Sequence, residues 1–311
     1  MSESAQFNIA LIAFLGLMAF FVGSYASIPP VVQDASAIVA SPYCADSFQW
    51  PNLTAKAAYI TDLSTDRVLF QKNAEAQLPL ASLTKLMTVY VALDSLVSTD
   101  YAEIPVNALL PEGDSGLFAH EVWQIRDLVD FTLMTSANDG AHALALLAGG
   151  KRALSEGGFV FLMNETAKSL NMPQTVFLND TGLDAASSTP GAMGSAHDMA
   201  TLLDAIFTKR PDAFGGSVLL KRMFVSGSNF THDATNTSMI AGLAPEAIIS
   251  KTGFTDLAGG NLALVFEPLL GHPVAAVVLG STREQRETDM ELLIFTVTQE
   301  LKRQTLCESQ I

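Results

Sequence analysis

The stretch at residues 80–96 constrains the fold of this chain most, because it predicts a helix buried on every side. It follows Pro79, contains no Gly or Pro, and carries apolar residues all around the helical period. Polar side chains on such a helix are costly unless they are paired. Ser82 and Lys85 lie near the start of the helix, so they share one face, one turn apart. A hydroxyl beside an amine in a dry site is the arrangement that activates a serine nucleophile.

The N-terminal part of the chain predicts export. Residues 9–28 form a run of 20 uncharged residues, about the length needed to span a bilayer. Two interpretations stay open: residues 1–28 are an uncleaved anchor, or they are a signal peptide cleaved after Ala26, which closes a small-x-small sequence. No Lys or Arg precedes the apolar run, which favours the anchor. Residues 29–50 predict a linker. Both interpretations place the main domain, residues 51–311, outside the cytoplasm.

Composition argues against some partners. The formal net charge is −15, and the acidic residues are spread along the chain. Such a surface repels nucleic acid, so we expect no nucleic-acid partner. The histidines are far apart in sequence and form no His-Glu-x-x-His motif, so we expect no metal and no cofactor. Cys44 and Cys307 flank the main domain, and they either form a disulfide in an oxidising compartment or stay as two free thiols.

The remaining pattern predicts an α+β domain with strands at both ends. A hairpin is expected at residues 57–70, around a turn at 64–66. The other expected elements are helices at 125–135, 141–148, 159–169 and from Ser195 to about Phe207, strands at 247–251, 261–266 and 274–279, and a closing helix at 289–301. We therefore expect one antiparallel sheet built from both ends of the domain, with helices packed on it and a helical insert.

Two further polar motifs lie at the ends of predicted elements. Ser136 and Asn138 fall on a loop between two helices, where helix capping is the alternative explanation. Lys251 ends a strand and is followed by Thr and Gly, and a glycine there lets another group approach the backbone closely. The sequence Gly-Asp-Ser-Gly at residues 113–116 also surrounds the serine of chymotrypsin-like proteases. That fold is all-β, whereas this segment lies between helical patterns.

Together the motifs form a recognisable set. Ser-x-x-Lys opens a buried helix, Ser-x-Asn follows on an inter-helix loop, and Lys-Thr-Gly ends a strand, as in penicillin-binding proteins and class A β-lactamases. Residues 56–300 resemble the D-alanyl-D-alanine carboxypeptidases among the low-molecular-mass penicillin-binding proteins. The similarity runs through residues 78–88, 136–139 and 251–255. It implies the α+β fold of the β-lactamase and transpeptidase type.

The resemblance also implies a role for each catalytic residue. Ser82 would attack the carbonyl between two D-alanines, and Lys85 would take the serine proton. Ser136 would pass a proton to the leaving amine, and Asn138 would hold Lys85 and the substrate amide. A free lysine, with a pKa of ~10.4, is a poor base near neutrality. Burial and the nearby cation Lys251 would lower the pKa of Lys85.

A second set of residues would bind the substrate. By resemblance, these residues are Lys251, Thr252, Gly253, Phe254, Thr255 and Arg286. The backbone N–H groups of Ser82 and Phe254 would form an oxyanion hole. The two threonine hydroxyls and one arginine would bind the terminal carboxylate of the substrate. Arg286 best fits the family's arginine just before a glutamate, and Arg283 is the alternative.

The sequence therefore predicts a penicillin-sensitive serine carboxypeptidase that trims D-alanine from peptidoglycan stem peptides, with β-lactams as covalent inhibitors. A DD-endopeptidase acting on cross-linked peptidoglycan is the alternative, because both attack a D-alanyl bond. A β-lactamase is less favoured, because no Glu-x-x-Leu-Asn segment lies between Ser136 and Lys251. The intact motifs argue against an inactive peptidoglycan-binding module. The expected location is the outer side of the cytoplasmic membrane.

Overall fold

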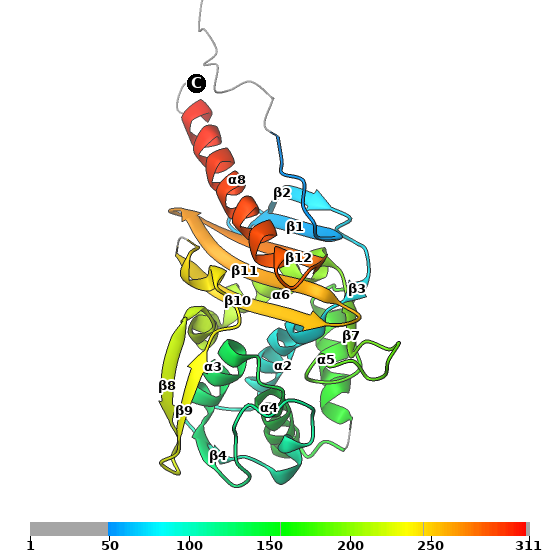
Figure 1. Cartoon of the computed structure of the whole chain (residues 1–311), viewed down its shortest axis with the longest axis vertical. Helices are drawn as coiled ribbons and strands as arrows, with labels where there is room; N and C mark the ends of the chain where they lie inside the picture. The colour runs from blue at the N-terminus through cyan, green and yellow to red at the C-terminus, as the bar shows by residue number, and fades with distance from the viewer. Residues whose placement is uncertain (1–48, 156, 245, 309–311) are drawn as a thin grey trace, which may run out of the picture. The chain divides into compact units, whose positions relative to one another are not determined.

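The computed structural model describes residues 49–155, 157–244 and 246–308. Within these residues, a central five-stranded antiparallel sheet has the order β10-β11-β12-β1-β2 (Figure 1). Its strands are β1 (Ala57–Asp62), β2 (Arg67–Lys72), β10 (Ala247–Thr255), β11 (Gly259–Leu269) and β12 (His272–Ser281). Strands from both ends of the domain therefore pair in one sheet, which confirms the predicted α+β fold.

The alternation of side chains along the strands creates two cores, one on each face of the sheet. Successive residues of a strand point to opposite faces. On β12, Val277 lies in the core that includes α6 (Ala196–Lys209), whereas Val278 lies in the core that includes α8 (Gln285–Glu308). Burial of each such side chain contributes roughly 1.5–3 kcal/mol. A continuous apolar run in β12 is therefore the mark of a strand covered on both faces.

The helical middle of the chain surrounds α2. Its main helices are α2 (Thr84–Ala92), α3 (Ile125–Thr135), α4 (Asn138–Lys151), α5 (Gly158–Ser169) and the short α7 (Pro211–Phe214). Helices α3, α4, α5 and α6 all contact α2, and every residue of α2 is buried. The predicted all-round burial of this helix is confirmed, so Lys85 on α2 lies in a dry interior.

Short elements complete the described chain. They are β3 (Leu78–Pro79), β4 (Tyr101–Glu103), β5 (Val122–Gln124), β6 (Val176–Phe177), β7 (Ala192–Gly194), β8 (Lys221–Val225), β9 (Thr231–Thr235), and the 3-10 turns η2 (Ala81–Leu83), η3 (Val106–Leu109), η4 (Gly215–Val218) and η5 (Ile240–Gly242). The β8–β9 hairpin was not predicted. Its strands are short and mostly exposed, so they carry little hydrophobic periodicity.

Two predicted helix boundaries differ from the structure. Helix α4 begins at Asn138 rather than near residue 141, and it continues through Gly149 and Gly150. Each glycine costs about 1 kcal/mol relative to alanine, which tertiary packing of the helix overrides here. Helix α8 extends well beyond the predicted residues 289–301, because its polar ends carry no apolar pattern.

The expectations for the N-terminus fall outside the described residues. The anchor or signal peptide at residues 1–28 lies outside them, as does the linker at 29–50 except for its last two residues. Within residues 49–308, no helix is long and apolar enough to cross a membrane. Cys307 is disulfide-bonded, which excludes a free thiol at this position, and Cys44 lies outside the described residues.

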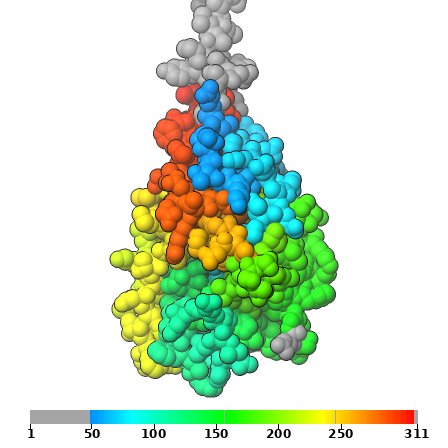
Figure 2. Space-filling view, turned by 45° about the vertical axis from the view of Figure 1, so that its right-hand side comes forward, coloured from blue at the N-terminus to red at the C-terminus, as the bar shows by residue number. Residues whose placement is uncertain are grey.

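Asp289 ties the beginning of the described domain to its end. One carboxylate oxygen accepts the Thr54 N–H at 2.8 Å, and the other accepts the Ala55 N–H at 2.8 Å and the Ser281 hydroxyl at 2.7 Å. Figure 2 shows the N-terminal residues in blue lying against the C-terminal residues in orange and red. The carboxylate is buried, so these three hydrogen bonds replace the hydrogen bonds to water that it loses on folding.

We expect Asp289→Asn to lower the free energy of unfolding by about 1–3 kcal/mol, because one acceptor oxygen becomes an NH2 group that faces a donor. Urea unfolding measures this change. Asp256→Asn is the matched control, because Asp256 is exposed and should shift the free energy of unfolding by less than about 0.5 kcal/mol. Equal effects of the two substitutions would contradict the assigned role of Asp289.

Candidate active site

Ser82 lies on the turn η2, between β3 and α2. The preceding residue, Ala81, has φ 49°, which is left-handed backbone that a residue with a Cβ rarely adopts. Such a conformation costs roughly 1–3 kcal/mol and persists only where surrounding contacts enforce it. The Thr84 hydroxyl donates a hydrogen bond to the Ala81 carbonyl at 2.7 Å, which is one of those contacts. The sequence predicted Ser82 at a helix start, and the structure adds that the first turn is strained.

The amine of Lys85 has three polar neighbours. Nζ lies 3.0 Å from Ser82 Oγ and 2.7 Å from Asn138 Oδ1. It also lies 2.7 Å from the carbonyl oxygen of Thr181. A neutral amine has two N–H groups and one lone pair. A carbonyl oxygen can only accept hydrogen bonds, so the oxygens of Asn138 and Thr181 each accept one N–H of the amine. The lone pair is then left for the hydroxyl proton of Ser82, as a general base requires.

Burial makes this protonation state accessible near neutral pH. Lys85 is fully buried, and loss of hydration lowers its pKa to about 7. The carboxylates of Asp180 and Asp139 oppose this shift because they favour the ammonium form. The predicted contribution of burial is therefore confirmed.

Lys251 is the nearby cation that the sequence predicts, and the two amines repel each other. Lys251 is also fully buried, and its pKa is well below the usual value because of burial, then repulsion by Lys85 and by Arg286. Repulsion between two cations disfavours the charged form of each, and how much Lys251 contributes to the pKa of Lys85 stays a prediction.

The pKa of Lys85 leads to a kinetic prediction. We expect the rate of Ser82 acylation to rise with pH as Lys85 loses its proton, with a midpoint near pH 7, because only the neutral amine accepts the serine proton. The second-order rate constant for labelling by a fluorescent penicillin, measured from pH 5 to 10, checks this. A rate that still climbs steeply at pH 9–10, as a lysine with its ordinary pKa of ~10.4 would give, contradicts it.

The three sequence motifs meet at this point of the fold. Ser136 caps α3 with left-handed backbone, φ 61°. Its hydroxyl oxygen accepts a hydrogen bond from Lys251 Nζ at 2.8 Å. Lys251 lies on β10 and also donates to the Thr252 carbonyl at 2.9 Å. Hydrogen bonds therefore link Ser82, Lys85 and Asn138 in one set, and Ser136 and Lys251 in a second.

Strand β10 passes against the turn that carries Ser82. A Cβ added to Gly253 would lie 2.8 Å from the Leu80 carbonyl oxygen and 3.2 Å from the Ser82 backbone nitrogen. Only glycine permits this approach without displacing the turn. The Ser82 N–H therefore lies beside β10. The complete oxyanion hole, with Phe254 as second donor, stays a prediction.

Asn261 fixes the same approach from β11. Its Nδ2 donates to the carbonyls of Pro79 and Leu80 at 2.9 and 3.0 Å, and its Oδ1 accepts the Gly280 N–H at 2.8 Å. The role of this residue was not predicted from the sequence. The available signal was a fully buried amide in an otherwise apolar strand, since a buried amide has to find partners.

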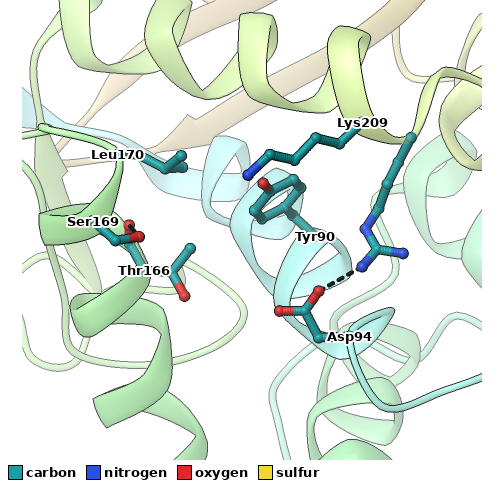
Figure 3. A pocket seen from close by; sticks show the side chains of 7 residues that line it. Tyr90, Asp94, Thr166, Ser169, Leu170 and Lys209 are labelled. Atoms are coloured by element: carbon teal, nitrogen blue, oxygen red, sulfur yellow. Dashed lines mark hydrogen bonds and ion pairs between the residues drawn. The ribbon is translucent and has the colours of Figure 1, made fainter.

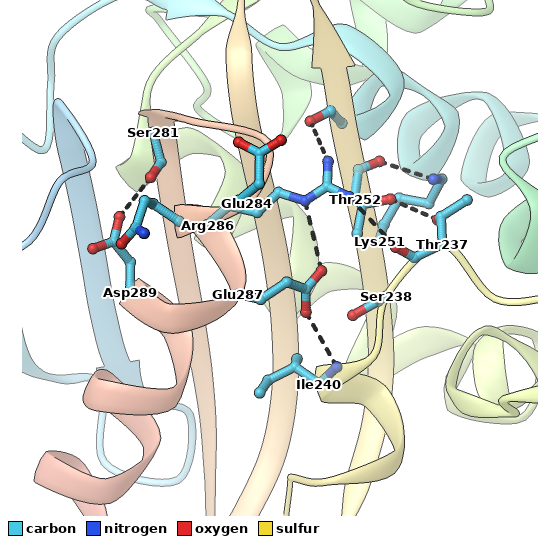
Figure 4. Close-up of polar contacts among 12 residues, drawn as sticks. Thr237, Ser238, Ile240, Lys251, Thr252, Ser281, Glu284, Arg286, Glu287 and Asp289 are labelled. Atoms are coloured by element: carbon cyan, nitrogen blue, oxygen red, sulfur yellow. Dashed lines mark hydrogen bonds and ion pairs between the residues drawn. The ribbon is translucent and has the colours of Figure 1, made fainter.

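The predicted carboxylate-binding residues lie around the end of β10 (Figure 4). The Thr252 hydroxyl is 2.6 Å from the Thr237 hydroxyl. Arg286 donates to the carbonyls of Gly253 at 3.0 Å and Thr237 at 3.4 Å, and it is buried. Its guanidinium therefore holds both segments that present these hydroxyls.

The other two predicted carboxylate ligands have different surroundings. The Thr255 hydroxyl donates to Asp184 Oδ1 at 3.1 Å. The Arg283 guanidinium carbon lies 5.1 Å from the centre of the Phe254 ring, at cation–π distance. Arg286 is thus the arginine that contacts the Lys-Thr-Gly segment, and its contact with substrate stays a prediction.

The segment with the Gly-Asp-Ser-Gly sequence lies beside the second motif. Asn138 Nδ2 donates to the Glu112 carbonyl at 2.7 Å. The Ser115 N–H donates to Asp139 Oδ2 at 3.1 Å. This segment therefore packs on the start of α4, and Asn138 is held by both Lys85 and Glu112.

A loop at residues 179–183 supplies the Thr181 carbonyl, and its role was not predicted from the sequence. Asn179 Oδ1 accepts the Gly182 N–H at 2.7 Å, and the Thr88 hydroxyl donates to the Asp180 carbonyl at 2.6 Å. Gly182 has φ +80°, and a Cβ there would lie 1.9 Å from the Ala81 carbonyl oxygen. The loop is therefore pressed against the Ser82 turn at a position that only glycine can occupy.

Two other places could be mistaken for the site. One potential ligand atom each from Glu75, His197 and Asp198 lies within 4.8 Å of the other two. They lie at the N-terminus of α6, whose dipole disfavours a cation, so we assign no metal there. The pocket in Figure 3 has a volume of about 360 Å³ and lies around Tyr90 and Asp94 at the C-terminal end of α2. None of the motif residues lines it.

Comparison with known proteins agrees with this geometry. A family model described as D-alanyl-D-alanine carboxypeptidase matches residues 45–283. The D-alanyl-D-alanine endopeptidase of Escherichia coli (strain K12) is 30% identical over 251 residues, covering 78% of this chain and 76% of that protein. The carboxypeptidase DacD of Salmonella typhimurium is 34% identical over 233 residues, covering 69% of this chain and 55% of that protein.

Solved structures show the same fold. Penicillin-binding protein D2 from Listeria monocytogenes, in an ampicillin-bound form, has a TM-score of 0.66 and 26% identity, covering 79% of this chain and 99% of that chain. The carboxypeptidase DacD from Francisella tularensis has a TM-score of 0.71 and 23% identity, covering 80% of this chain and 71% of that chain. The second likeness shows the fold alone.

Proposed function

Because the chain belongs to the D-alanyl-D-alanine carboxypeptidase family of serine peptidases, we propose that it removes the last D-alanine from peptidoglycan stem peptides. The observation that supports this most strongly is the 3.0 Å contact between Ser82 Oγ and Lys85 Nζ. Both N–H groups of the neutral amine have carbonyl acceptors, so its lone pair faces the serine hydroxyl.

The proposed reaction has two steps. Ser82 Oγ bonds to the carbonyl carbon of the D-alanyl-D-alanine bond while its proton moves to Lys85 Nζ. The C–N bond then breaks, and the leaving amine takes a proton through Ser136. Water adds to the acyl-enzyme and releases the shortened peptide with Ser82 restored. The backbone N–H groups of Ser82 and Phe254 would stabilise the oxyanion in both steps, and Arg286 with Thr252 and Thr255 would bind the terminal carboxylate.

A synthetic pentapeptide that ends in D-Ala-D-Ala tests the proposal. We expect the purified protein to release one D-alanine, so that the peptide loses the mass of one alanine residue in the mass spectrum. The matched peptide ending in D-Ala-L-Ala is the control and should persist. No release of D-alanine from the first peptide would refute the carboxypeptidase activity.

An endopeptidase is the second candidate. Two of the curated relatives, from Escherichia coli and Pseudomonas aeruginosa, are named D-alanyl-D-alanine endopeptidases, and the chain covers 76% and 67% of their lengths. A cross-linked muropeptide dimer separates the two activities. Cleavage of the dimer into monomers with the pentapeptide left intact would establish the endopeptidase instead. Removal of the terminal alanine alone would establish the carboxypeptidase.

We further propose that β-lactams acylate Ser82 and that the domain acts on the outer side of the cytoplasmic membrane, held there by residues 1–28. The ampicillin-bound relative supports the first statement. The uncharged run at residues 9–28 supports the second. Carbonate washing of membranes tests the anchor: an anchored chain stays in the pellet, whereas a chain cleaved after Ala26 appears in the soluble fraction.

A further inference from the structure

A histidine on α4 lies behind the catalytic lysine. His142 Nδ1 is 2.7 Å from Asp180 Oδ2, and the carboxylate is mostly buried. His142 is one helical turn beyond Asn138, and Asp180 immediately precedes Thr181. Asn138 and Thr181, which accept the hydrogen bonds of the Lys85 amine, therefore each lie close in sequence to one member of this pair.

Asp180 connects the two helices that position Lys85, which are α2 and α4. The main chain of Asp180 is bound to α2, because its carbonyl accepts the Thr88 hydroxyl at 2.6 Å. The side chain of Asp180 is bound to α4 through His142. Helix α2 carries Lys85, and α4 carries Asn138. A shift of the loop away from α4 would move the Thr181 carbonyl and leave one N–H of Lys85 without an acceptor.

We propose that His142 is a positioning residue for Lys85, acting through Asp180 on the Thr181 carbonyl and on the local charge. This inference rests on the proposed function of Lys85 as the base. Asp180 is one of the two carboxylates that favour the ammonium form of Lys85, and a protonated His142 partly cancels its charge. The His142–Asp180 pair thus sets both the direction of the Lys85 lone pair and the pH at which it becomes free.

His142 can exchange protons with solvent. Its ring lines a cavity of about 540 Å³, with Asp180 beside it and residues such as Leu110, Phe159 and Val160 on the walls. Among the described residues of this cavity, Asp180 is the other titratable group. The hydrogen bond to Asp180 raises the pKa of His142, while burial opposes the shift. Around Lys85 itself, the charged groups are Asp180, Asp139 on α4 and Lys251 on β10.

Two substitutions test the proposal because they should move the same quantity in opposite directions. Asp180→Asn removes the anion, so the midpoint of the pH–acylation profile should fall by about 1 pH unit. His142→Gln can keep a hydrogen bond but removes the positive charge, so the midpoint should rise by about half a unit. We expect His142→Gln also to lower the acylation rate at its optimum by about tenfold, because the Thr181 carbonyl is held less firmly.

His272→Gln is the matched control. His272 Nδ1 is 2.8 Å from Asp62 Oδ2, the same kind of pair where β12 begins and β1 ends. It should leave the midpoint unchanged. Unchanged midpoints in Asp180→Asn and His142→Gln, or shifts in the same direction, would overturn the proposal, because a purely structural disturbance has no reason to reverse sign.

A second readout does not depend on catalysis. NMR titration of the wild-type His142 ring should give a pKa above the ordinary ~6.5, and Asp180→Asn should lower it. An ordinary pKa of His142 in the wild type would overturn the proposed role of the His142–Asp180 pair, even if His142→Gln does not fold. If the wild-type protein binds no penicillin at any pH, the proposed function fails. If it binds penicillin and the variants behave like the wild type, only the role of His142 fails.

Discussion

Replacing Ser82 with alanine is expected to abolish labelling by a fluorescent penicillin and to lower D-alanine release by at least about 10³-fold. The covalent bond of the acyl-enzyme is made to Ser82 Oγ, so its removal leaves no atom to acylate. The residual rate would come from substrate binding and the backbone donors alone. Gel fluorescence after a saturating dose of the penicillin measures the label, and mass spectrometry locates it on the peptide that contains Ser82.

Ser115→Ala is the matched control. Ser115 is the serine of the Gly-Asp-Ser-Gly sequence, and its backbone N–H contacts Asp139 at the start of α4. This variant should be labelled like the wild type. Label that survives Ser82→Ala and disappears with Ser115→Ala would show that Ser115 is the nucleophile. That result would overturn the assignment of the site.

Three residues of the proposed site were predictable from the sequence, because each of them is polar within an apolar pattern. Ser82 and Lys85 are polar on a helix that is apolar on every side, and Lys251 follows an apolar run. The strand was expected to end at Lys251, but β10 continues to Thr255 because it stays paired with β11. The central sheet was also predictable, because β1, β11 and β12 are buried and strongly apolar. Long elements with strong patterns are where sequence reasoning works best.

The supporting residues could not be predicted in this way. The Thr181 carbonyl is a backbone group, and any residue could supply it. Asn261 and His142 become meaningful only when β11 and α4 are placed beside the Ser82 turn and the Asp180 loop.

Gly182→Ala is expected to have the largest effect of any single methyl group in the site. The added Cβ would lie 1.9 Å from the Ala81 carbonyl oxygen and 2.6 Å from Thr84 Oγ1. Both atoms belong to the turn that holds Ser82, so either this turn or the loop with Thr181 has to move. We expect the free energy of unfolding to fall by about 2–4 kcal/mol and acylation to slow by at least about 100-fold.

Gly271→Ala separates the steric clash from the backbone preference of glycine. Gly271 has φ +81°, almost the same as the +80° of Gly182, but a Cβ there would meet nothing within 4 Å. This variant should lose only the roughly 1 kcal/mol that alanine requires in left-handed backbone, with acylation unchanged. Urea unfolding and penicillin labelling of the two variants give the comparison. If Gly182→Ala acylates as fast as Gly271→Ala, the position of the Thr181 carbonyl does not control Lys85, and the pressure of the 179–183 loop on the Ser82 turn is structural only.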